Sequence, residues 1–495
     1  MGEECNKDSY KESLKATSLF GGVQIFNIFI GIVRSKFVAI LLGPNGMGIV
    51  GLLSSTIGLI NSLTNFGLGT SAVRDIASAN STGETRKIAL VIQVFRRLVW
   101  ITGLMGLFVC IFLSPYLSYI TFGNYNYTIA FIILSSTILF TQLTTGQTAL
   151  LQGMRKYAFL AKANVLGNSL GLIVTIPLYY LLKIDAIVPV LIVTSFFSLA
   201  LSLYYSKKTG IEKIHITFND VRTEGKGMLK MGFFISLQGI LSVAASYLIR
   251  IFISNYGGLS DVGLFTAGFS IVNTYVGLIF TAMGTDYYPR LSAESVSDKI
   301  IFNKVVNQQI EISLLLLAPI ITIFIIFIRL VVTILFSSKF LPIEGMIYWA
   351  IFGVFFKAVS WSIAFSFLAK GDTKAFFWNE LAAILYSTMF NVLGYLYWKL
   401  TGLGVSFLVG YIVYLIQVWI VSGKRYEVYI QKGIFKIFII QFFLSFVCIL
   451  LVLFTQLVVR YVLGTILVIL SFYYSYIELD KRIEFSRYIK KNNRE

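Results

Sequence analysis

Residues 314–328 read LLLLAPIITIFIIFI, a stretch without a single charged side chain. Similar uninterrupted apolar blocks occupy residues 98–113 and 442–454. A transmembrane helix needs roughly 20 predominantly apolar residues, whereas the strands of an outer-membrane barrel alternate apolar and polar residues over about 10 positions. Blocks of this length therefore predict helices that cross a lipid bilayer.

The composition of the whole chain agrees with this interpretation. Of its 495 residues, 57% are hydrophobic and 13% are charged, and only 7 are proline. A soluble domain usually contains about 25% charged residues. The sequence thus predicts an all-α, polytopic membrane protein.

Fourteen transmembrane helices are expected from the apolar blocks. They lie at about 17–42, 46–72, 94–118, 124–149, 157–182, 186–206, 229–256, 260–285, 305–336, 343–369, 374–399, 402–422, 433–455 and 459–479. An even number of spans places both termini on the same side of the membrane.

The net charge of +18 is explained by the loops. Loops on the side of the termini hold most of the 41 lysines and arginines. Those on the opposite side hold Lys183, Arg329, Lys339, Lys399 and Arg460. By the positive-inside rule both termini are cytoplasmic, and the charge does not call for a nucleic-acid partner.

The sequence contains an internal repeat, in which matching residues recur 215 to 218 positions apart across three helix junctions. The matches are Leu14–Lys15 with Leu229–Lys230, Arg34 with Arg250, Gly48 with Gly263, Gly69–Thr70 with Gly284–Thr285, Arg74 with Arg290, and Gly153, Lys156 and Phe159 with Gly371, Lys374 and Phe377. Six spans separate the copies, so the copies have the same orientation. Two parallel lobes are a transporter architecture.

The repeat predicts four parts of the chain. They are a six-helix lobe over 1–206, a cytoplasmic linker over 207–228, a second six-helix lobe over 229–422, and two additional helices with a basic cytoplasmic tail over 423–495. No hydrophilic segment is long enough for a soluble catalytic domain, so we expect the membrane bundle itself to carry the function.

Basic residues inside predicted spans are the first candidates for a binding site, because a centred lysine or arginine costs roughly 2.5–3.5 kcal/mol on insertion scales. Lys357 lies near the middle of its span. Arg34 ends a polar stripe along one helix face. The stripe contains Gln24, Asn27, Gly31 and Arg34. Arg250 is the repeat counterpart of Arg34, and Lys36 lies off the stripe.

Acidic residues are scarce in the spans, and none lies between Glu12 and Arg74. Glu380 begins a stripe with Ser387 and Asn391, which we interpret as part of a cavity or a coupling site, or as a lysine partner. Hydroxyl and amide groups also recur at helical spacing. Examples are Thr141, Thr144 and Thr148, and Asn164 and Asn168. They fit hydrogen bonds between helices or a path for sugar hydroxyls. Buried cations with few buried anions favour an anionic substrate.

Other classes of site are not indicated. The chain has no Gly-x4-Gly-Lys-Ser/Thr phosphate loop, and Cys5, Cys110 and Cys448 are isolated. The single histidine, His215, lies in a hydrophilic stretch and is interpreted as a surface residue. We therefore expect no catalytic cluster, no metal and no cofactor.

Three short sequences at helix junctions resemble a known family. Residues 41–48 read LLGPNGMG and residues 67–74 read GLGTSAVR, and residues 151–157, LQGMRKY, precede the fifth span. These turns, the span count and the two lobes resemble bacterial O-antigen and polysaccharide repeat-unit translocases, which are flippases of the multidrug/oligosaccharidyl-lipid/polysaccharide exporter superfamily.

The resemblance implies a two-lobed fold in the bacterial inner membrane. It also implies movement of an undecaprenyl-diphosphate-linked oligosaccharide to the periplasmic leaflet, with membrane lipids and glycan polymerase machinery as partners. In the related lipid II flippases a first-helix arginine faces the cavity, and Arg34 is at the matching place. The multidrug branch uses buried acids in its first lobe, which this sequence lacks.

Several alternatives stay open. A lipid II-type or teichoic-type flippase would use the same chemistry on another glycan. A cation-coupled drug exporter is disfavoured by the missing acids. A membrane polysaccharide polymerase is disfavoured by the parallel repeat and the absence of a long periplasmic loop.

Overall fold

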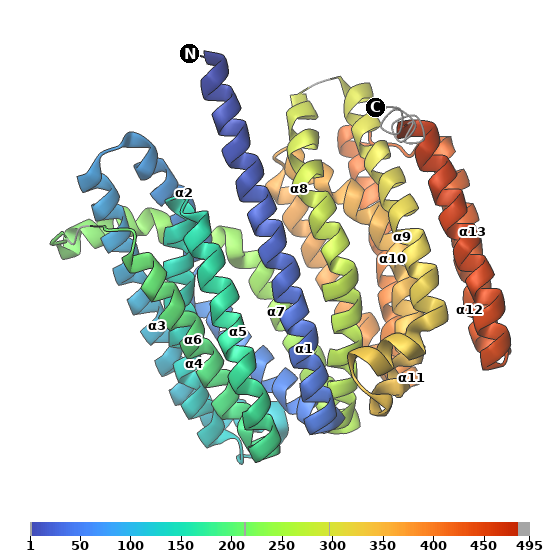
Figure 1. Cartoon of the computed structure of the whole chain (residues 1–495), viewed down its shortest axis with the longest axis horizontal. Coiled ribbons are helices and arrows are strands. Elements are labelled where there is room, and N and C mark those ends of the chain that lie inside the picture. The colour runs from blue at the N-terminus through green and yellow to red at the C-terminus, as the bar shows by residue number, and fades with distance from the viewer. Residues whose placement is uncertain (1, 212–213, 297, 484–495) are drawn as a thin grey trace, which may run out of the picture. The chain divides into compact units, whose positions relative to one another are not determined.

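A computed structural model of the chain describes residues 2–211, 214–296 and 298–483. Helices make up nearly all of this part, and it contains no β-strand (Figure 1). Contacts divide the chain into two compact units, unit 1 from Met1 to Gly263 and unit 2 from Leu264 to Glu495. The predicted all-α class is confirmed.

Unit 1 begins with a long apolar helix that is broken once. Its helices are α1 (Gly2–Thr64), α2 (Leu68–Thr82), α3 (Thr85–Phe122), α4 (Thr128–Gly153), α5 (Tyr157–Leu182), α6 (Ile187–Lys207) and the first part of α7 (Phe218–Ser270). The break in α1 is at Gly43, with φ 66° and ψ −168°. This conformation is essentially restricted to glycine, and Pro44 directly follows it.

The second span ends earlier than the predicted 46–72. Phe66 and Gly67 adopt left-handed conformations, and the side-chain oxygen of Asn65 accepts a hydrogen bond from the Gly67 N–H at 2.7 Å. The chain then continues as the short helix α2. One face of α2 is buried with side chains of α3 and α4 through Leu68, Ala72, Ile76 and Ala79.

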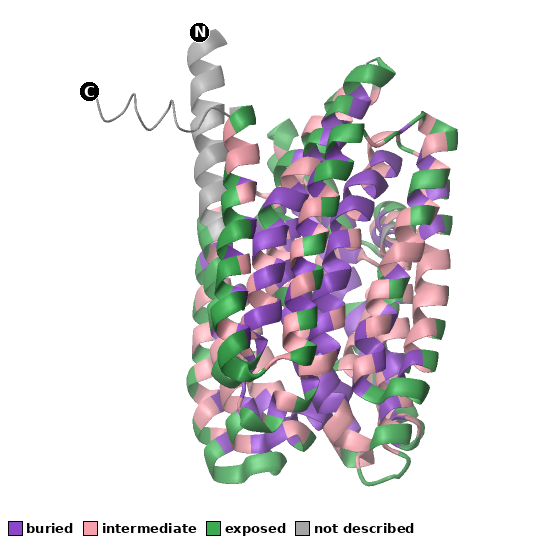
Figure 2. Ribbon diagram, turned by 90° about the vertical axis from the view of Figure 1, so that its right-hand side faces the viewer, coloured by how far each residue is buried: buried purple, intermediate pink, exposed green. Residues whose placement is uncertain are grey.

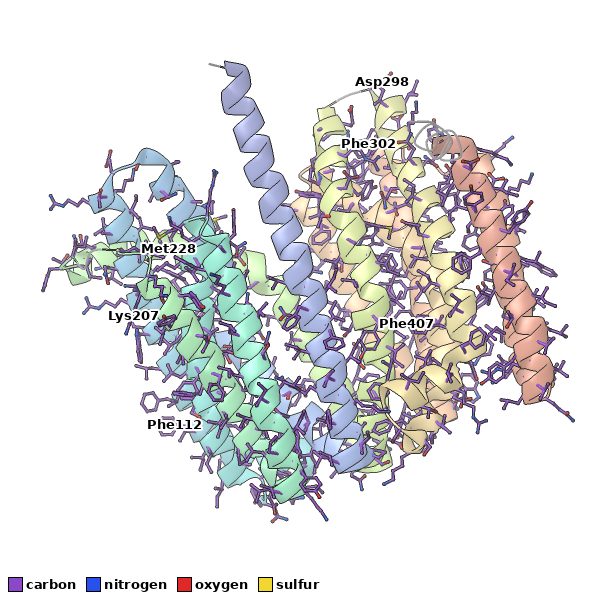
Figure 3. All side chains as sticks on the ribbon, viewed as in Figure 1. Phe112, Lys207, Met228, Asp298, Phe302 and Phe407 are labelled. Atoms are coloured by element: carbon purple, nitrogen blue, oxygen red, sulfur yellow. The ribbon has the colours of Figure 1, made fainter. Side chains whose placement is uncertain are left out.

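Unit 2 begins within α7, at Leu264. Its helices are the end of α7, a π-helical stretch (Ile271–Val276), α8 (Gly277–Ala293), α9 (Lys299–Leu335), α10 (Glu344–Ala369), α11 (Thr373–Tyr426), α12 (Lys432–Phe454) and α13 (Leu457–Ile483). The Asp298 side chain caps α9 by accepting from the Ile300 N–H. Phe302, one turn further along, is buried; Asp298 and Phe302 are labelled in Figure 3.

The predicted span count is supported by the lengths of the helices. Among the described residues, ten helical segments are long and apolar enough to cross a membrane. Four of them are long enough for two spans and are interrupted by a break or a short turn, which gives fourteen. Figure 2 marks exposed residues along many of the helices. Many exposed residues are large and apolar, such as Phe112 and Phe454, each 79% exposed. Such surfaces fit lipid rather than water, and the chain is a multi-pass membrane protein.

Backbone breaks recur along the chain at the separation of the repeat. Gly43 has its counterpart in Gly258, at φ 80° and ψ −179°, and the same offset relates Gly48 to Gly263. Lys183, at φ 49° and ψ −123°, has its counterpart in Lys399, at φ 50° and ψ −134°. A positive φ is uncommon for a lysine, so its recurrence at the same place supports the internal repeat.

The turns that follow α4 and α10 correct one detail of the sequence match. In the first turn the N–H of Lys156 donates to the carbonyl of Leu151, and in the second the N–H of Asp372 donates to the carbonyl of Phe367. Lys156 therefore corresponds to Asp372, at the offset that relates Lys183 to Lys399. The pairing of Gly153 with Gly371 was wrong.

The sequence match at this turn paired two glycines that do not occupy equivalent positions. Its left-handed position is Arg155 in one copy and Gly371 in the other. Aligning glycine with glycine therefore moved this part of the repeat out of register.

The predicted lobe boundaries, 1–206 and 229–422, follow the repeat, whereas the compact units divide inside α7. The predicted linker, 207–228, includes the beginning of α7, where Val221 and Met228 are buried in the core of unit 1. Lys207, at the end of α6, and Met228 are labelled in Figure 3. The lobe boundaries stay a prediction.

Helix α13 is attached to α9 through a buried arginine. The guanidinium of Arg460, which is 5% exposed, donates to the carbonyl of Ile326 from Nε at 3.1 Å and from Nη2 at 2.9 Å. It also lies 5.5 Å from the ring centroid of Tyr348. The predicted loop residue Arg460 thus has a structural role.

Candidate functional site

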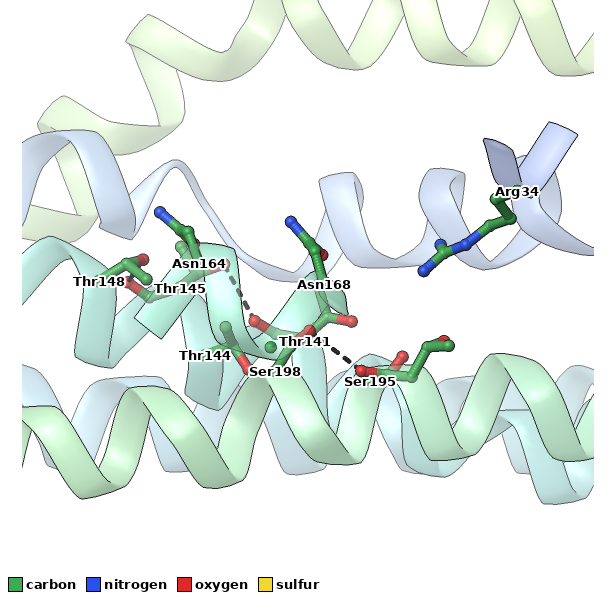
Figure 4. Close-up of a pocket in the computed structure, with 11 residues that line it drawn as sticks. Arg34, Thr141, Thr144, Thr145, Thr148, Asn164, Asn168, Ser195 and Ser198 are labelled. Carbon is green, nitrogen blue, oxygen red and sulfur yellow. Dashed lines mark hydrogen bonds between the residues drawn. The ribbon is translucent and has the colours of Figure 1, made fainter. Parts of the chain in front are cut away.

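A polar pocket lies among four helices of unit 1, with a volume of about 320 Å³. Arg34 comes from α1 and extends towards polar side chains of α4, α5 and α6 (Figure 4). The lining residues are Arg34, Thr141, Thr144, Thr145, Thr148, Asn164, Gly167, Asn168, Thr194, Ser195 and Ser198. The pocket joins the predicted cation to both predicted hydroxyl and amide stripes.

The hydroxyl groups of this pocket present acceptors. Six of them donate their proton to a carbonyl three or four residues earlier in the same helix, at 2.8 to 3.0 Å. They are Thr144, Thr145, Thr148, Thr194, Ser195 and Ser198, and dashed lines in Figure 4 mark the bonds between drawn residues. A hydroxyl has one proton and two lone pairs, so each oxygen can still accept a hydrogen bond from a ligand.

Among the described residues that line the pocket, Arg34 is the one that carries a charge. Its Nε is buried and has no hydrogen-bond partner within the described ranges, and no carboxylate among the described residues interacts with it. Gly171 gives the side chain room, since a Cβ there would lie 3.3 Å from Nη2. A guanidinium without a counter-ion in a membrane span favours an anionic group of a ligand.

The other residues of the predicted Arg34 stripe differ in position. The Asn27 side-chain oxygen accepts a hydrogen bond from the amide of Asn168, a pocket residue, at 2.9 Å. Gln24 is exposed and does not line this pocket. Lys36 is half-buried and also lies outside the lining set.

Arg250 is bonded to its own helix. One guanidinium nitrogen donates to the carbonyl of Ser246 at 3.1 Å and also to the Ser246 hydroxyl. Arg34, by contrast, lines the polar pocket. The breaks at Gly43 and Gly258 are 215 residues apart, whereas Arg34 and Arg250 are 216 residues apart. The two arginines therefore do not occupy corresponding positions of their helices, and the predicted pairing of Arg34 with Arg250 was wrong.

Lys357 in unit 2 is surrounded by aromatic rings. Its Nζ lies 5.1 Å from the ring centroid of Phe280, 5.5 Å from that of Tyr411 and 5.9 Å from that of Phe407. Cation–π contacts of this kind stabilise an ammonium group by roughly 0.5–2 kcal/mol. No ion pair of Lys357 is found within the described ranges, and the rings leave its positive charge uncompensated.

The predicted stripe on α11 is divided between two settings. Glu380 accepts a hydrogen bond from the Tyr414 hydroxyl. The amide of Asn391 donates to the Ser387 carbonyl at 2.8 Å, while its Oδ1 is buried and has no hydrogen-bond partner in the described part of the chain. Glu380 therefore interacts with a tyrosine of the same helix, whereas the amide group of Asn391 is bonded to the backbone of that helix.

The corrected register of the repeat relates the two groups of polar residues. The offset between Lys183 and Lys399 also pairs Thr141 with Lys357, Asn164 with Glu380, Ser195 with Tyr411, and Ser198 with Tyr414. The pocket of small hydroxyls and amides in unit 1 therefore corresponds to the group of charged and aromatic residues in unit 2. Sequence reasoning missed this relation, because it placed this part of the repeat out of register.

A second pocket, in unit 2, is aromatic and was not predicted. It has a volume of about 390 Å³. It is lined by Phe280, Thr281, Gly284, Thr285, Tyr288, Trp361, Phe365 and Leu368, from α8 and α10. The helical spacing of Phe280, Gly284 and Tyr288 is a signal in the sequence. Aromatic residues are so common in this chain, with 43 Phe and 28 Tyr, that the signal did not stand out.

Metal chemistry has no support in the described part of the chain, which contains no group of three His, Cys, Asp or Glu residues that could hold a metal ion. Cys110 and Cys448 are both buried and free.

Comparison with protein families gives a match over most of the chain. The family described as polysaccharide biosynthesis protein matches residues 37–344. This chain belongs to that polysaccharide biosynthesis family. A comparison with curated proteins finds no match.

Solved structures similar to this polysaccharide biosynthesis protein are transporters of the MOP superfamily. A lipid II flippase, MurJ, in an inward closed conformation has a TM-score of 0.71 at 14% identity, covering 95% of this chain and 99% of that one. An inward-facing MATE family multidrug resistance transporter has a TM-score of 0.70 at 16% identity, covering 81% and 94%. A MOP superfamily transporter from Pyrococcus furiosus has a TM-score of 0.59 at 16% identity, covering 83% and 96%. At these identities the similarity establishes the fold.

Proposed function

We propose that this protein is a flippase for an undecaprenyl-diphosphate-linked oligosaccharide, an O-antigen or similar repeat unit. It moves the head group from the cytoplasmic to the periplasmic leaflet of the bacterial inner membrane by alternating access. Both termini are cytoplasmic in this proposal. The observation that carries it is the polar pocket of unit 1, where an arginine without a described carboxylate partner lies among hydroxyl acceptors.

The chemistry of the pocket matches the two parts of such a head group. Sugar hydroxyls donate hydrogen bonds, and the threonine and serine oxygens of the pocket accept them. Diphosphate oxygens only accept, so they pair with Arg34, whose guanidinium has donors in a fork that fits phosphate. A cationic drug would be repelled by Arg34, which argues against a drug exporter.

The family and the fold support the same class of function. The family is described by polysaccharide biosynthesis, and one similar structure is a lipid II flippase. A lipid II-type or teichoic-type flippase remains the main alternative, since its substrate has the same diphosphate and a different glycan. A membrane polysaccharide polymerase, the enzymatic alternative, is not supported by any similar structure named above.

We assign supporting roles to the remaining candidates. Lys357 supplies a second cation for the anionic head group, and Arg250, Asn27 and Gln24 contribute further polar contacts. Glu380, Asn391 and Lys36 take part in the cavity or in coupling to an ion gradient. Membrane lipids surround the protein, and glycan polymerase machinery receives the product.

Depletion of the protein tests the proposal. The lipid-linked repeat unit should accumulate, and it should be inaccessible to a glycan-modifying enzyme added outside the inner membrane of spheroplasts. Accumulation of lipid II instead would favour the alternative glycan. Unchanged levels and sidedness of all lipid-linked glycans would overturn the flippase proposal.

A further inference from the structure

The aromatic pocket of unit 2 has walls whose rings hold one another in place. Trp361 and Phe365 of α10 lie with ring centroids 4.7 Å apart at 68°, and Phe280 of α8 meets Trp361 at 5.4 Å and 67°. Tyr288 lies 5.8 Å from Phe365. Edge-to-face contacts of this kind stabilise ring pairs beyond the area that they bury, so the pocket offers flat, fixed aromatic surfaces.

Gly284 is the reason that α8 and the indole ring can lie so close. A Cβ at this position would be 3.3 Å from Cζ2 of Trp361. The π-helical stretch Ile271–Val276 leads directly into α8, and π-helical turns often occur at functional sites. The local backbone is therefore adapted to the pocket.

Two threonines give the pocket a polar edge. The hydroxyl of Thr281 donates to the Gly277 carbonyl at 3.1 Å, and that of Thr285 donates to the Ala282 carbonyl at 2.7 Å. Both threonines line the pocket. Their oxygens can therefore accept hydrogen bonds, as those of the unit 1 pocket can.

The repeat relates the aromatic pocket to the polar one. In unit 1 a Cβ on Gly69 would lie 2.8 Å from Cγ2 of Thr145, and Thr145 lines the polar pocket. The counterparts of Gly69 and Thr145 are Gly284 and Trp361. The same contact between a glycine and the fourth helix of each copy thus borders a pocket in both units.

We propose that the aromatic pocket binds a pyranose ring of the transported glycan by stacking. This inference rests on the proposed flippase function. The apolar C–H face of the sugar lies on the indole of Trp361, and hydroxyls at the edge of the sugar donate to Thr281 and Thr285. The positive charge of Lys357, which lies against Phe280 of this pocket, favours glycans that carry an acidic group.

The rival occupant is the polyprenyl chain of the substrate. A hydrocarbon chain would fill the apolar volume, but it would make no hydrogen bond to the oxygens of Thr281 and Thr285, which can still accept one. A hydrocarbon chain also binds a flat aromatic ring little better than it binds a flexible aliphatic side chain. A sugar ring can both stack on the aromatic rings and hydrogen-bond to the threonines.

Two substitutions separate these occupants in cells. Trp361→Phe keeps an aromatic face, and Trp361→Leu keeps an apolar side chain without one. We expect export of the glycan per protein molecule to fall about fivefold or more in Trp361→Leu, and to fall much less in Trp361→Phe. Trp378→Leu, which removes a 65% exposed indole from α11, is the control and should export normally. Normal export by Trp361→Leu would overturn the inference.

A binding measurement on the full-length protein covers the case in which a variant folds poorly. The probe is the oligosaccharide released from the lipid that accumulates on depletion, and the competitor is geranylgeranyl diphosphate. We expect the oligosaccharide to change the tryptophan fluorescence of the wild-type protein, and this change to be lost in Trp361→Phe. A change produced by the isoprenoid and not by the oligosaccharide would overturn the sugar assignment.

The two proposals fail in different ways. If depletion leads to no accumulation of any lipid-linked glycan, the flippase function fails. If the glycan accumulates but Trp361→Leu exports it like wild type, only the sugar-stacking site fails.

Discussion

Thr145 and Trp361 occupy the same position in the two repeats, each packed against the counterpart glycine of its own unit, Gly69 or Gly284. One residue presents a hydroxyl acceptor to a polar pocket, and the other presents an indole to an aromatic pocket. A duplicated helix contact has thus acquired two chemistries. This is the division expected of a transporter whose substrate has polar edges and apolar faces.

Arg34→Ala is expected to lower glycan export per molecule about tenfold or more, because hydrogen bonds to charged groups contribute roughly 1.5–3 kcal/mol each. Protein abundance should stay normal, since Arg34 makes no ion pair within the described ranges. Arg34→Lys should be partly active at best, because lysine lacks the two-pronged grip on phosphate. Export and membrane abundance are measured in the same cells, together with Lys357→Ala.

Arg460→Ala is the matched control for this experiment. Its guanidinium is bonded to the carbonyl of Ile326 and buried, so its loss should lower abundance first and export only in proportion. Wild-type export per molecule in both Arg34→Ala and Lys357→Ala would contradict the anion-binding role of the two cations.

Ser195→Tyr introduces the residue found at the counterpart position, Tyr411, into the unit 1 pocket. A phenol ring would project into a cavity of about 320 Å³ and narrow it, so we expect export to fall while the protein remains in the membrane. Thr465→Tyr on α13 is the control. Thr465 is exposed, and its hydroxyl also donates to a carbonyl four residues earlier, at 2.7 Å. Equal export by both variants would show that substrate does not enter the pocket.

The fold was largely predictable because lipid leaves a strong signal in the sequence. Apolar blocks such as 314–328 indicated the spans, and the Gly43–Pro44 turn indicated a break. The breaks at Lys183 and Lys399 were not predicted in their conformation, since nothing in a lysine indicates a positive φ. The surrounding helices impose that backbone shape, so it is a tertiary effect.

The site was predictable only in parts. Helical periodicity picked out Arg34 and Asn27 on one face of the first span, and Thr141 to Thr148 on another helix. These faces meet in one pocket because their helices are neighbours. The periodicity within one helix carries no information about which other helices lie beside it. Trp361 was missed for a different reason, because aromatic residues are frequent throughout a membrane protein.

The stability of unit 2 should depend on the ionisation of Asp372. This carboxylate accepts hydrogen bonds from the Ala375 N–H at 3.0 Å, at the start of α11, and from Arg425 at 2.6 Å. The hydrogen bond from Ala375 lowers the pKa of Asp372 most, and those from Tyr426 and Arg425 lower it further, so this pKa lies below its usual value. A lowered folded-state pKa means that the stabilisation is present above the usual pKa, near 3.8, and is lost as the pH falls through the lower value.

Thermal unfolding of the purified protein between pH 3 and pH 6 checks this dependence on Asp372. Asp372→Asn keeps a side-chain acceptor for the Ala375 N–H but lacks the charge. The difference in melting temperature between wild type and this variant should be largest at pH 6 and should shrink towards pH 3. A difference that is independent of pH would contradict the assignment.

The breaks at Gly43 and Gly258 should be equally sensitive to a single added methyl group. Their backbone conformation is nearly closed to other residues, so Gly43→Ala and Gly258→Ala should each destabilise the protein by about 1–3 kcal/mol. An added Cβ would meet no atom within 4 Å at either position, so the cost comes from the backbone alone.

Gly31→Ala is the control for these two substitutions. Its added Cβ also meets nothing within 4 Å, but Gly31 lies inside helical backbone, where alanine is favoured by about 1 kcal/mol. Melting temperatures of the purified variants should therefore fall for the first two and stay level or rise for Gly31→Ala. If Gly43→Ala were as stable as Gly31→Ala, the break would not be a fixed part of the fold, and the corresponding break at Gly258 would lose its support as a mark of the repeat.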